Sequence, residues 1–282
     1  MTDLSSLDPA PFTRVTPTLD GVPETLLWPL RSRAGVSVLD RAFFDDPLAV
    51  DSLNRLDYDF ARFGPVNHWH AVRSKYSDEL IRAYLAKHPN AQVLALGEGL
   101  ETQLWRVDNG SVRWLCVDLP ESIALRRVLL PEHPRLTELP LSALDPSVFD
   151  SVDATDGLFV TAAGLLMYFE PEDVTALVNR IAANTGDIPV DLFFDAIPHW
   201  LSRRTLKGWH MQNGYVTPPM PFGLTRKDLP KLLGDVPGLS IVEARNYGDV
   251  YPDRNRAMAL AGKVPVVRDL APLLIHGRFQ KP

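Results

Sequence analysis

The stretch from Val93 to Asp118 places the tightest limit on what this chain can fold into. One apolar run, VLAL, ends in Gly97-Glu98-Gly99, and a second, WLCV, ends in Asp118. A strand, a glycine turn and a helix, followed by a strand that ends in an acid about twenty residues later, form the start of a nucleotide-binding βαβ unit. The stretch therefore predicts an α/β fold with a nucleotide-type ligand at the sheet edge.

Strand and helix signals alternate along the rest of the chain. The expected strands are 92–96, 112–117, 136–140, 157–162, 190–195 and 239–244, with a last one near 257–261. The expected helices are 67–88, 100–107, 120–130, 171–184 and 226–234. This alternation favours a mostly parallel sheet that is covered by helices on both faces.

Two regions do not follow the alternation. Residues 1–24 carry four prolines among polar residues, which indicates a loosely held tail within an N-terminal extension, 1–66, that contributes to a cap. Residues 197–225 are rich in aromatic residues, Met and Pro, and are expected to form a cap inserted into a single domain that spans 67–282.

Composition narrows the classes of function. The formal net charge of −6 disfavours nucleic acid as a partner, because phosphate binding needs clustered Lys and Arg. The sequence contains no run of 18 apolar residues, so no membrane span is predicted. The N-terminus lacks the apolar core of a signal peptide, and a cytoplasmic protein is therefore expected. The single cysteine, Cys116, rules out an intrachain disulfide and disfavours a cysteine metal site. The oligomeric state is left open, with a homodimer as one option.

The residues after the first strand bear on the identity of the nucleotide. A dinucleotide site would have a third glycine where this chain has Thr102, and a pyrophosphate would face the carboxylates of Glu98 and Glu101. S-adenosylmethionine has no phosphate and carries a sulfonium and an ammonium, and the carboxylate of Asp118 can accept from both of its ribose hydroxyls. Alternatively, the glycines only make a tight turn and the glutamates only stabilise the helix dipole.

Several motifs in order resemble a known family. The chain reads LALGEGLETQLWRVDNGSVRWLCVDLPESIALRRVLLPEH, then LSALD, then GLLMYFEPEDV. These motifs resemble the leucine carboxyl methyltransferase family, and within it the branch of tetracenomycin polyketide-synthesis O-methyltransferases of secondary metabolism. The resemblance runs from about Leu26 to Arg278. It implies a class I, Rossmann-like methyltransferase with a seven-stranded sheet whose last strand is antiparallel, and S-adenosylmethionine as cofactor.

The resemblance also implies roles for single residues. Asp118 would hold the ribose, and Arg73 would bind the carboxylate of the cofactor. The remaining cofactor contacts that it implies are Leu96, Gly97, Gly99, Leu119, Ser142, Ala143, Leu144, Ala162 and Ala163. Asp145 could accept from the adenine amine or could simply cap the next turn.

The chain departs from the family pattern at two places. Many relatives have Asp-Thr-Arg where this chain has Glu101-Thr102-Gln103, and the protein-methylating branch has Glu-Gly where this chain has Ala163-Gly164. The side chain of Ala163 cannot receive the ammonium of the cofactor, so backbone carbonyls near Gly97 or Ala162 would have to do so. The second departure disfavours methylation of a protein C-terminus.

The acceptor is expected to be a small aromatic or polyketide-like acid or phenol that is methylated on oxygen. A carboxylate is ionised at neutral pH and needs no base, whereas a phenol benefits from one. Tyr168, His199 and His210 are the candidate catalytic residues. His68 and His70 are interpreted as structural or solvated, and no metal site is expected. An NAD-type oxidoreductase, a scaffold without activity and a protein carboxyl methyltransferase stay open as alternatives.

Overall fold

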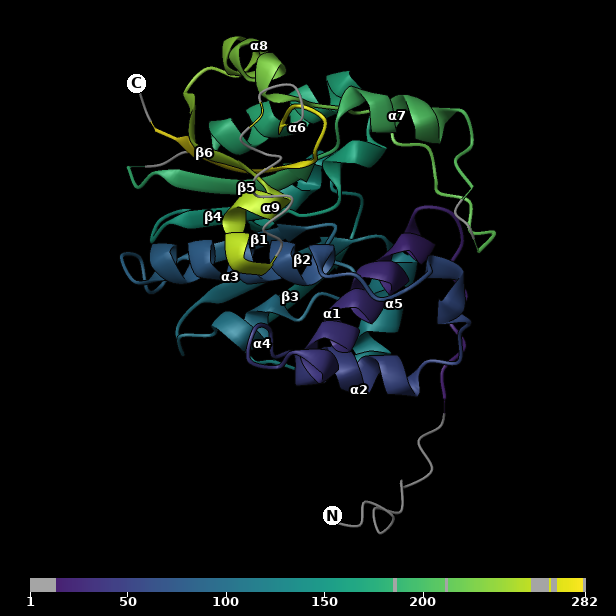
Figure 1. Ribbon diagram of the computed structural model, residues 1–282. Helices are drawn as coiled ribbons and strands as arrows, with labels where there is room; N and C mark the ends of the chain where they lie inside the picture. The colour runs from purple at the N-terminus through teal and green to yellow at the C-terminus, as the bar shows by residue number, and fades with distance from the viewer. Residues whose placement is uncertain (1–13, 185–186, 211–212, 255–263, 265–267, 281–282) are drawn as a thin grey trace.

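The computed structural model describes residues 14–184, 187–210, 213–254, 264 and 268–280. In this part of the chain, seven strands form one sheet in the order β3-β2-β1-β4-β5-β7-β6 (Figure 1). The strands are β1 (Gln92–Leu96), β2 (Arg113–Asp118), β3 (Leu136–Pro140), β4 (Leu158–Ala162), β5 (Val190–Ala196), β6 (Leu239–Asn246) and β7 (Leu273–Phe279). The first five pair in parallel, and β7 runs antiparallel between β5 and β6. The expected α/β fold is confirmed.

Helices cover both faces of the sheet. They are α1 (Leu27–Leu39), α2 (Pro47–Arg55), α3 (Trp69–Leu85), α4 (Gln103–Val107), α5 (Pro120–Leu129), α6 (Pro171–Ala183), α7 (His199–Leu206), α8 (Leu229–Asp235) and α9 (Tyr247–Val250). Residues of α3 and α4 pack on one face of the sheet, and residues of α6 and α8 pack on the other. Short 3₁₀ helices, η1 (Pro23–Leu26), η2 (Phe60–Phe63), η3 (Pro146–Ser151), η4 (Leu166–Tyr168), η5 (Arg226–Asp228) and η6 (Pro252–Arg254), complete the described elements.

The two cores explain why β1 is an unbroken apolar run. Successive side chains of a strand point to opposite faces. Leu94 and Leu96 accordingly join the core with α6, while Val93 and Ala95 join the core with α3. Both faces of β1 are buried, so the sequence shows a continuous run in place of an alternating one.

The expected elements agree with the structure except at the end of the chain. The expected strand near 257–261 lies outside the described residues, and the strand that the structure does show after β6 is β7. The sequence of β7, LLIHGRF, contains His276 and Arg278, and these polar residues interrupt the apolar pattern that would predict a strand. Both side chains pair with the buried Asp191 of the neighbouring β5, at 2.8 and 2.6 Å. An ionic partner on the next strand therefore permits polar residues there.

The N-terminal region is more ordered than expected from residue 14 onward. Val15 pairs with the backbone of Arg55 and Asp57, and η1 and α1 follow shortly afterwards. Leu27 and Leu30 of α1 form a third core with Phe63 of η2 and Tyr215. The expectation of a loose tail is thus wrong for residues 14–24, because Val15 and Leu19 pack against this third core. Residues 1–13 lie outside the described part. Among the described residues, no helix has the length and apolar character to cross a membrane.

Candidate active site

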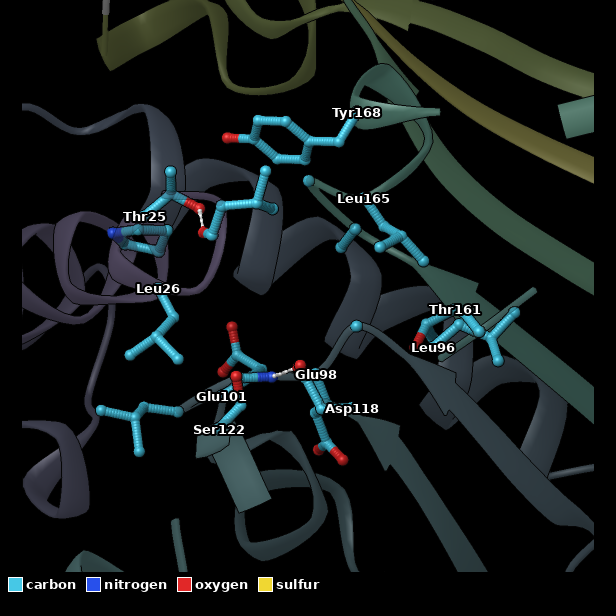
Figure 2. A pocket seen from close by; sticks show the side chains of 18 of the residues that line it. Thr25, Leu26, Leu96, Glu98, Glu101, Asp118, Ser122, Thr161, Leu165 and Tyr168 are labelled. Carbon is cyan, nitrogen blue, oxygen red and sulfur yellow. Dashed lines mark hydrogen bonds between the residues drawn. The ribbon is translucent and has the colours of Figure 1, made fainter. Parts of the chain in front are cut away.

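A cavity of about 380 Å³ lies at the carboxyl ends of β1, β2 and β4. Its floor comes from the loops that follow these strands, and its opposite side comes from η1, α1 and α3. Figure 2 shows Thr25 and Leu26 on the side of the N-terminal helices and Leu96 and Thr161 across the open space. Ligands of open α/β sheets bind at this edge.

The glycine loop forms a tight corner of the cavity. Gly97 and Gly99 have φ values of 61° and 53°, in the left-handed region that favours glycine. A Cβ at Gly97 would lie 2.6 Å from a methyl carbon of Leu165, so the loop also needs glycine for close approach. Arg126 of α5 fixes the loop from below by donating to the carbonyls of Gly99 and Glu101, at 2.8 and 2.6 Å.

Asp118 ends β2 beside this loop. Its two carboxylate oxygens accept from the N–H groups of Gly99 and Leu119, each at 2.7 Å. Burial raises the pKa of Asp118, and these two N–H groups oppose the rise. Each carboxylate oxygen has about two acceptor positions, so the side chain keeps capacity for further hydroxyl donors. The carboxylate therefore connects the two loops and can still bind a ligand.

The two loop glutamates do not present free charge to the cavity. Glu98 is buried and accepts from the indole N–H of Trp114 at 3.0 Å, with Arg126 at 3.3 Å. Glu101 pairs with Arg106 at 2.7 Å and with Arg33 at 3.2 Å. Burial tends to raise the pKa of Glu101, but the two arginines outweigh it and hold the pKa well below its usual value. Internal arginines therefore neutralise both carboxylates, so the expected repulsion of a pyrophosphate by Glu98 and Glu101 is not present in the structure.

Arg73 reaches the cavity from α3. Its Nη1 donates to Asp195 at 3.0 Å, and the other oxygen of Asp195 accepts from the N–H of Gly164 at 2.5 Å. The Nε of Arg73 is buried and has no hydrogen-bond partner among the described residues. A Cβ on Gly164 would lie 2.5 Å from Nη1, so this glycine leaves room for the guanidinium. Asp78, on the same helix, pairs with Arg106 at 2.8 Å.

Most of the other expected cofactor contacts also line the cavity. These are Leu96, Gly97, Gly99, Leu119, Ser142, Ala143 and Ala163. Leu144 and Ala162 do not line it: Ala162 is buried in the core with α6, and Leu144 packs against that same core. Asp145 caps η3 by accepting from the N–H of Ser147 at 2.9 Å, in agreement with its alternative role.

The three expected catalytic residues lie in different places. Tyr168 of η4 lines the cavity. His199 and His210 do not. His199 pairs with Asp228 at 2.8 Å, and His210 forms an isolated bridge with Val216. The structure therefore does not bring the two histidines to this cavity, and α7 directs His199 toward η5.

The cavity is covered mainly by the N-terminal region and not by residues 197–225. Of the described residues in 197–225, only Met220 lines the cavity, and Tyr215 packs against Trp28 and Phe63 instead. Sequence reasoning missed the cavity residues Thr25, Leu26, Trp28, Pro29, Arg33 and His70. One signal was present: His70, Arg73, Ser74 and Ser77 follow the i, i+3, i+4, i+7 spacing of one helix face.

The family model for leucine carboxyl methyltransferases matches residues 32–182. This chain belongs to the leucine carboxyl methyltransferase family. A curated relative, the tetracenomycin polyketide synthesis O-methyltransferase TcmP of Streptomyces glaucescens, is 33% identical over 191 residues, which cover 66% of this chain and 69% of that protein. The chain is thus an S-adenosylmethionine-dependent methyltransferase, and S-adenosylmethionine is its cofactor.

Solved structures agree with the fold. A candidate methyltransferase from Thermobifida fusca YX superposes with a TM-score of 0.60 at 18% identity, covering 98% of this chain and 100% of that one. A DUF574 family protein from Streptomyces avermitilis gives a TM-score of 0.54 at 17% identity, covering 89% of this chain and 97% of that one. These similarities place the sheet in the class I methyltransferase fold.

The unpartnered polar atoms of the cavity fit the cofactor. Asp118 retains acceptor capacity, and the Nε of Arg73 is a buried donor without a partner. The hydroxyl of Ser77, which also belongs to a cavity residue, is likewise buried without a partner among the described residues. A ligand with ribose hydroxyls and an amino-acid end supplies partners for groups of this kind. No cluster of three or more metal-ligating side chains occurs among the described residues.

Proposed function

We propose that this methyltransferase transfers a methyl group to an oxygen of a small aromatic or polyketide-like acceptor, a phenol or a carboxylate. The observation that carries the proposal is a set of apolar, aromatic and sulfur-containing side chains among the residues that line the cavity. They are Leu26, Trp28, Met167, Tyr168, Phe169 and Met220. Flat apolar ligands bind in such surroundings. The similarity to TcmP, whose name states polyketide O-methylation, supports the same class of acceptor.

In this proposal the sheet edge holds the cofactor. Asp118 accepts from the ribose hydroxyls, Leu119, Ser142 and Ala143 border the adenine, and Arg73 donates to the carboxylate. When bound, the cofactor supplies an electrophilic methyl group on a sulfonium, which is a good leaving group. The ammonium is left to backbone carbonyls, because Ala163 has no polar side chain.

The chain itself then positions the acceptor and excludes water. The 3₁₀ helix η1 and the start of α1 cover the cavity, so an acceptor held there is screened from solvent. Glu24 ties this cover to η2 by accepting from Tyr58 at 2.5 Å and from Arg62 at 2.9 Å. We therefore assign the capping role chiefly to the N-terminal region, with Met220 as the contribution of 197–225.

Tyr168 is better suited to donate a hydrogen bond than to remove a proton. Burial raises the pKa of Tyr168, and the phenol consequently stays protonated at neutral pH. A protonated hydroxyl at the cavity wall can orient an acceptor oxygen, but it cannot serve as a base.

The test is a product analysis with a defined acceptor panel. The purified protein is supplied with S-adenosylmethionine and, separately, with naphthol, naphthoic acid or a short peptide that ends in leucine. We expect methylated naphthol or naphthoate in the mass spectrum, and mild base separates the two because it hydrolyses an ester and not an ether. Methylation of the peptide alone, or of a nitrogen, would replace the proposal with a different acceptor class.

A further inference from the structure

Asp195 lies near the carboxyl end of β5, and its buried carboxylate accepts from three other parts of the chain. Nη1 of Arg73 donates to Oδ2 at 3.0 Å, and the hydroxyl of Tyr247 on α9 donates to the same oxygen at 2.9 Å. The N–H of Gly164, in the loop after β4, donates to Oδ1 at 2.5 Å. Arg73 and Gly164 line the cavity and Asp195 does not. Asp195 can therefore act on a ligand only through the groups that it holds.

The charge of Arg73 depends on this one contact. Within the part of the chain that the structure describes, Asp195 is the one ion-pair partner of Arg73. Glu101 acts on Arg73 from further away, and its carboxylate already pairs with Arg33 and Arg106. Without Asp195, the guanidinium would bring an unbalanced positive charge to the cavity wall.

Stability alone gives a weak reason for such a pair. Taking two charges out of water has a cost that their attraction often fails to exceed, so apolar residues of similar volume commonly serve a core as well. Burial disfavours the charge of Arg73, but Asp195 outweighs burial, and the pKa of Arg73 lies above its usual value. Arg73 also keeps its Nε buried and without a partner among the described residues. The pair thus keeps a charged donor ready at the cavity.

The chemistry of the cofactor explains why the charge of this donor should be balanced. S-adenosylmethionine has a carboxylate at its amino-acid end and a sulfonium cation only a few bonds away. A lone guanidinium that attracts the carboxylate would also repel the sulfonium, because Coulomb interactions inside a protein extend over several ångströms. A guanidinium paired with a carboxylate is neutral as a unit and still has N–H groups to donate. S-adenosylhomocysteine has a neutral thioether and escapes this repulsion.

We propose that Asp195 is a positioning residue that acts through Arg73: it holds the guanidinium at the cavity wall and balances its charge, so that Arg73 binds the carboxylate of S-adenosylmethionine without repelling the sulfonium. Tyr247 and Gly164 hold Asp195 in turn. The inference rests on the cofactor role of Arg73 in the proposed function. It adds that the choice between the cofactor and its demethylated product depends on Asp195.

The experiment compares Asp195→Asn with Asp191→Asn. Asp191 is also buried on β5, pairs with His276 and Arg278 and is absent from the cavity lining, so it is the matched control. Calorimetry gives the dissociation constants of S-adenosylmethionine and S-adenosylhomocysteine for each variant. We expect the ratio of the first constant to the second to rise about tenfold in Asp195→Asn, the order of magnitude for one unbalanced charge several ångströms away. The ratio should stay at the wild-type value in Asp191→Asn.

Further variants separate charge from packing. Asp195→Glu keeps the charge and should keep the wild-type ratio. Tyr247→Phe removes a hydrogen bond but no charge, so it should weaken both ligands by the same factor. Arg73→Met leaves the carboxylate of Asp195 unbalanced and should lower the ratio, and adding Asp195→Asn to it should restore the ratio. This last pair of variants tests the charge of Asp195 even if Asp195→Asn alone does not fold.

The outcomes distinguish this inference from the function on which it rests. Equal weakening of both ligands in Asp195→Asn, or the same ratio in Arg73→Met with and without Asp195→Asn, would reduce Asp195 to a structural residue. The cofactor role of Arg73 would then still stand, provided that Arg73→Met weakens S-adenosylhomocysteine more than adenosine. Equal losses of those two ligands in Arg73→Met would overturn the role of Arg73 and this inference together. The class of acceptor is decided separately, by the product analysis above.

Discussion

The two sides of the cavity are built on different physical principles. On the sheet side, the loops after β1 and β2 are held by buried charges, with Arg126 on Glu98 and Arg106 on Glu101. On the helical side, the cover is held by aromatic packing, with Trp28 stacked on Phe63 at 5.9 Å and Tyr215 edge-on to both. Charged networks fix atoms with directional bonds, whereas apolar walls tolerate changes of shape. A constant cofactor suits the first arrangement, and a variable acceptor suits the second.

The largest effect should come from breaking the ionic support on the sheet side. Arg126→Met removes the partner of the buried Glu98 and the donor to two loop carbonyls. Loss of one member of a buried pair costs about 3–5 kcal/mol, so we expect a decrease of that size in the free energy of unfolding by denaturant titration. Arg127→Met on the same helix, where the arginine is 57% exposed, should cost far less. Equal losses for the two variants would contradict the comparison.

The next largest effect concerns cofactor binding itself. Asp118→Ala removes an acceptor that also bridges the N–H groups of Gly99 and Leu119. We expect calorimetry to show S-adenosylhomocysteine binding weakened by about 1.5–3 kcal/mol, the usual cost of losing a hydrogen bond to a charged group. Asp145→Ala, which removes only the cap of η3, is the control and should bind normally. An unchanged affinity in Asp118→Ala would show that Asp118 does not hold the ribose.

A smaller effect on cofactor affinity is expected at Gly164, where the loop after β4 meets Arg73 of α3. Gly164→Ala places a Cβ 2.5 Å from Nη1 of Arg73 at a φ of 74°. Gly208→Ala has a similar φ of 77° and open space around it, so it reproduces the backbone strain, roughly 1–2 kcal/mol, without the clash. We expect only Gly164→Ala to weaken S-adenosylhomocysteine more than adenosine, since adenosine lacks the carboxylate that Arg73 would bind. The same selectivity in both variants would show that Arg73 does not bind the carboxylate of the cofactor.

The smallest effect should come from weakening the hydrogen bonds that Glu24 of η1 accepts. Glu24→Gln weakens the bonds from Tyr58 and Arg62, and Arg62 is 41% exposed. Partly exposed pairs contribute below about 1 kcal/mol, so stability and cofactor affinity should barely change. The KM for naphthol should rise, because η1 is held less firmly, and Asp51→Asn in α2 should leave it unchanged. A large loss of cofactor affinity would show that the two sides are not independent.

The sequence predicts one side of the cavity much better than the other. Gly97, Gly99 and Asp118 lie within a single βαβ unit, where spacing along the chain maps directly onto spacing in the fold. Leu26, Trp28 and His70 carry no such local pattern, because tertiary packing alone brings them to the sheet edge. His70 is an example: helical spacing relates it to Arg73, but only the fold shows which face of α3 is turned to the cavity.

The strand and helix assignments follow the same rule. β1, β2 and α5 were predictable because apolar runs and a proline at the first helical turn are local signals. β7 was not, since the polar residues His276 and Arg278 are explained only by Asp191 on another strand. The placement of His199 was missed for a similar reason: its partner, Asp228, lies in a different element.

The position of Trp28 early in the chain has a consequence for synthesis in the cell. Its partner Tyr215 is added far later, and at about 5–20 residues per second the delay is on the order of ten seconds or more. During that time Leu27, Leu30 and Trp28 have left the ribosome without Tyr215, the last member of their core. The helical side of the cavity is therefore completed last and stays open to chaperones and proteases longest, whereas β1, β2 and the loop between them can fold as soon as they emerge.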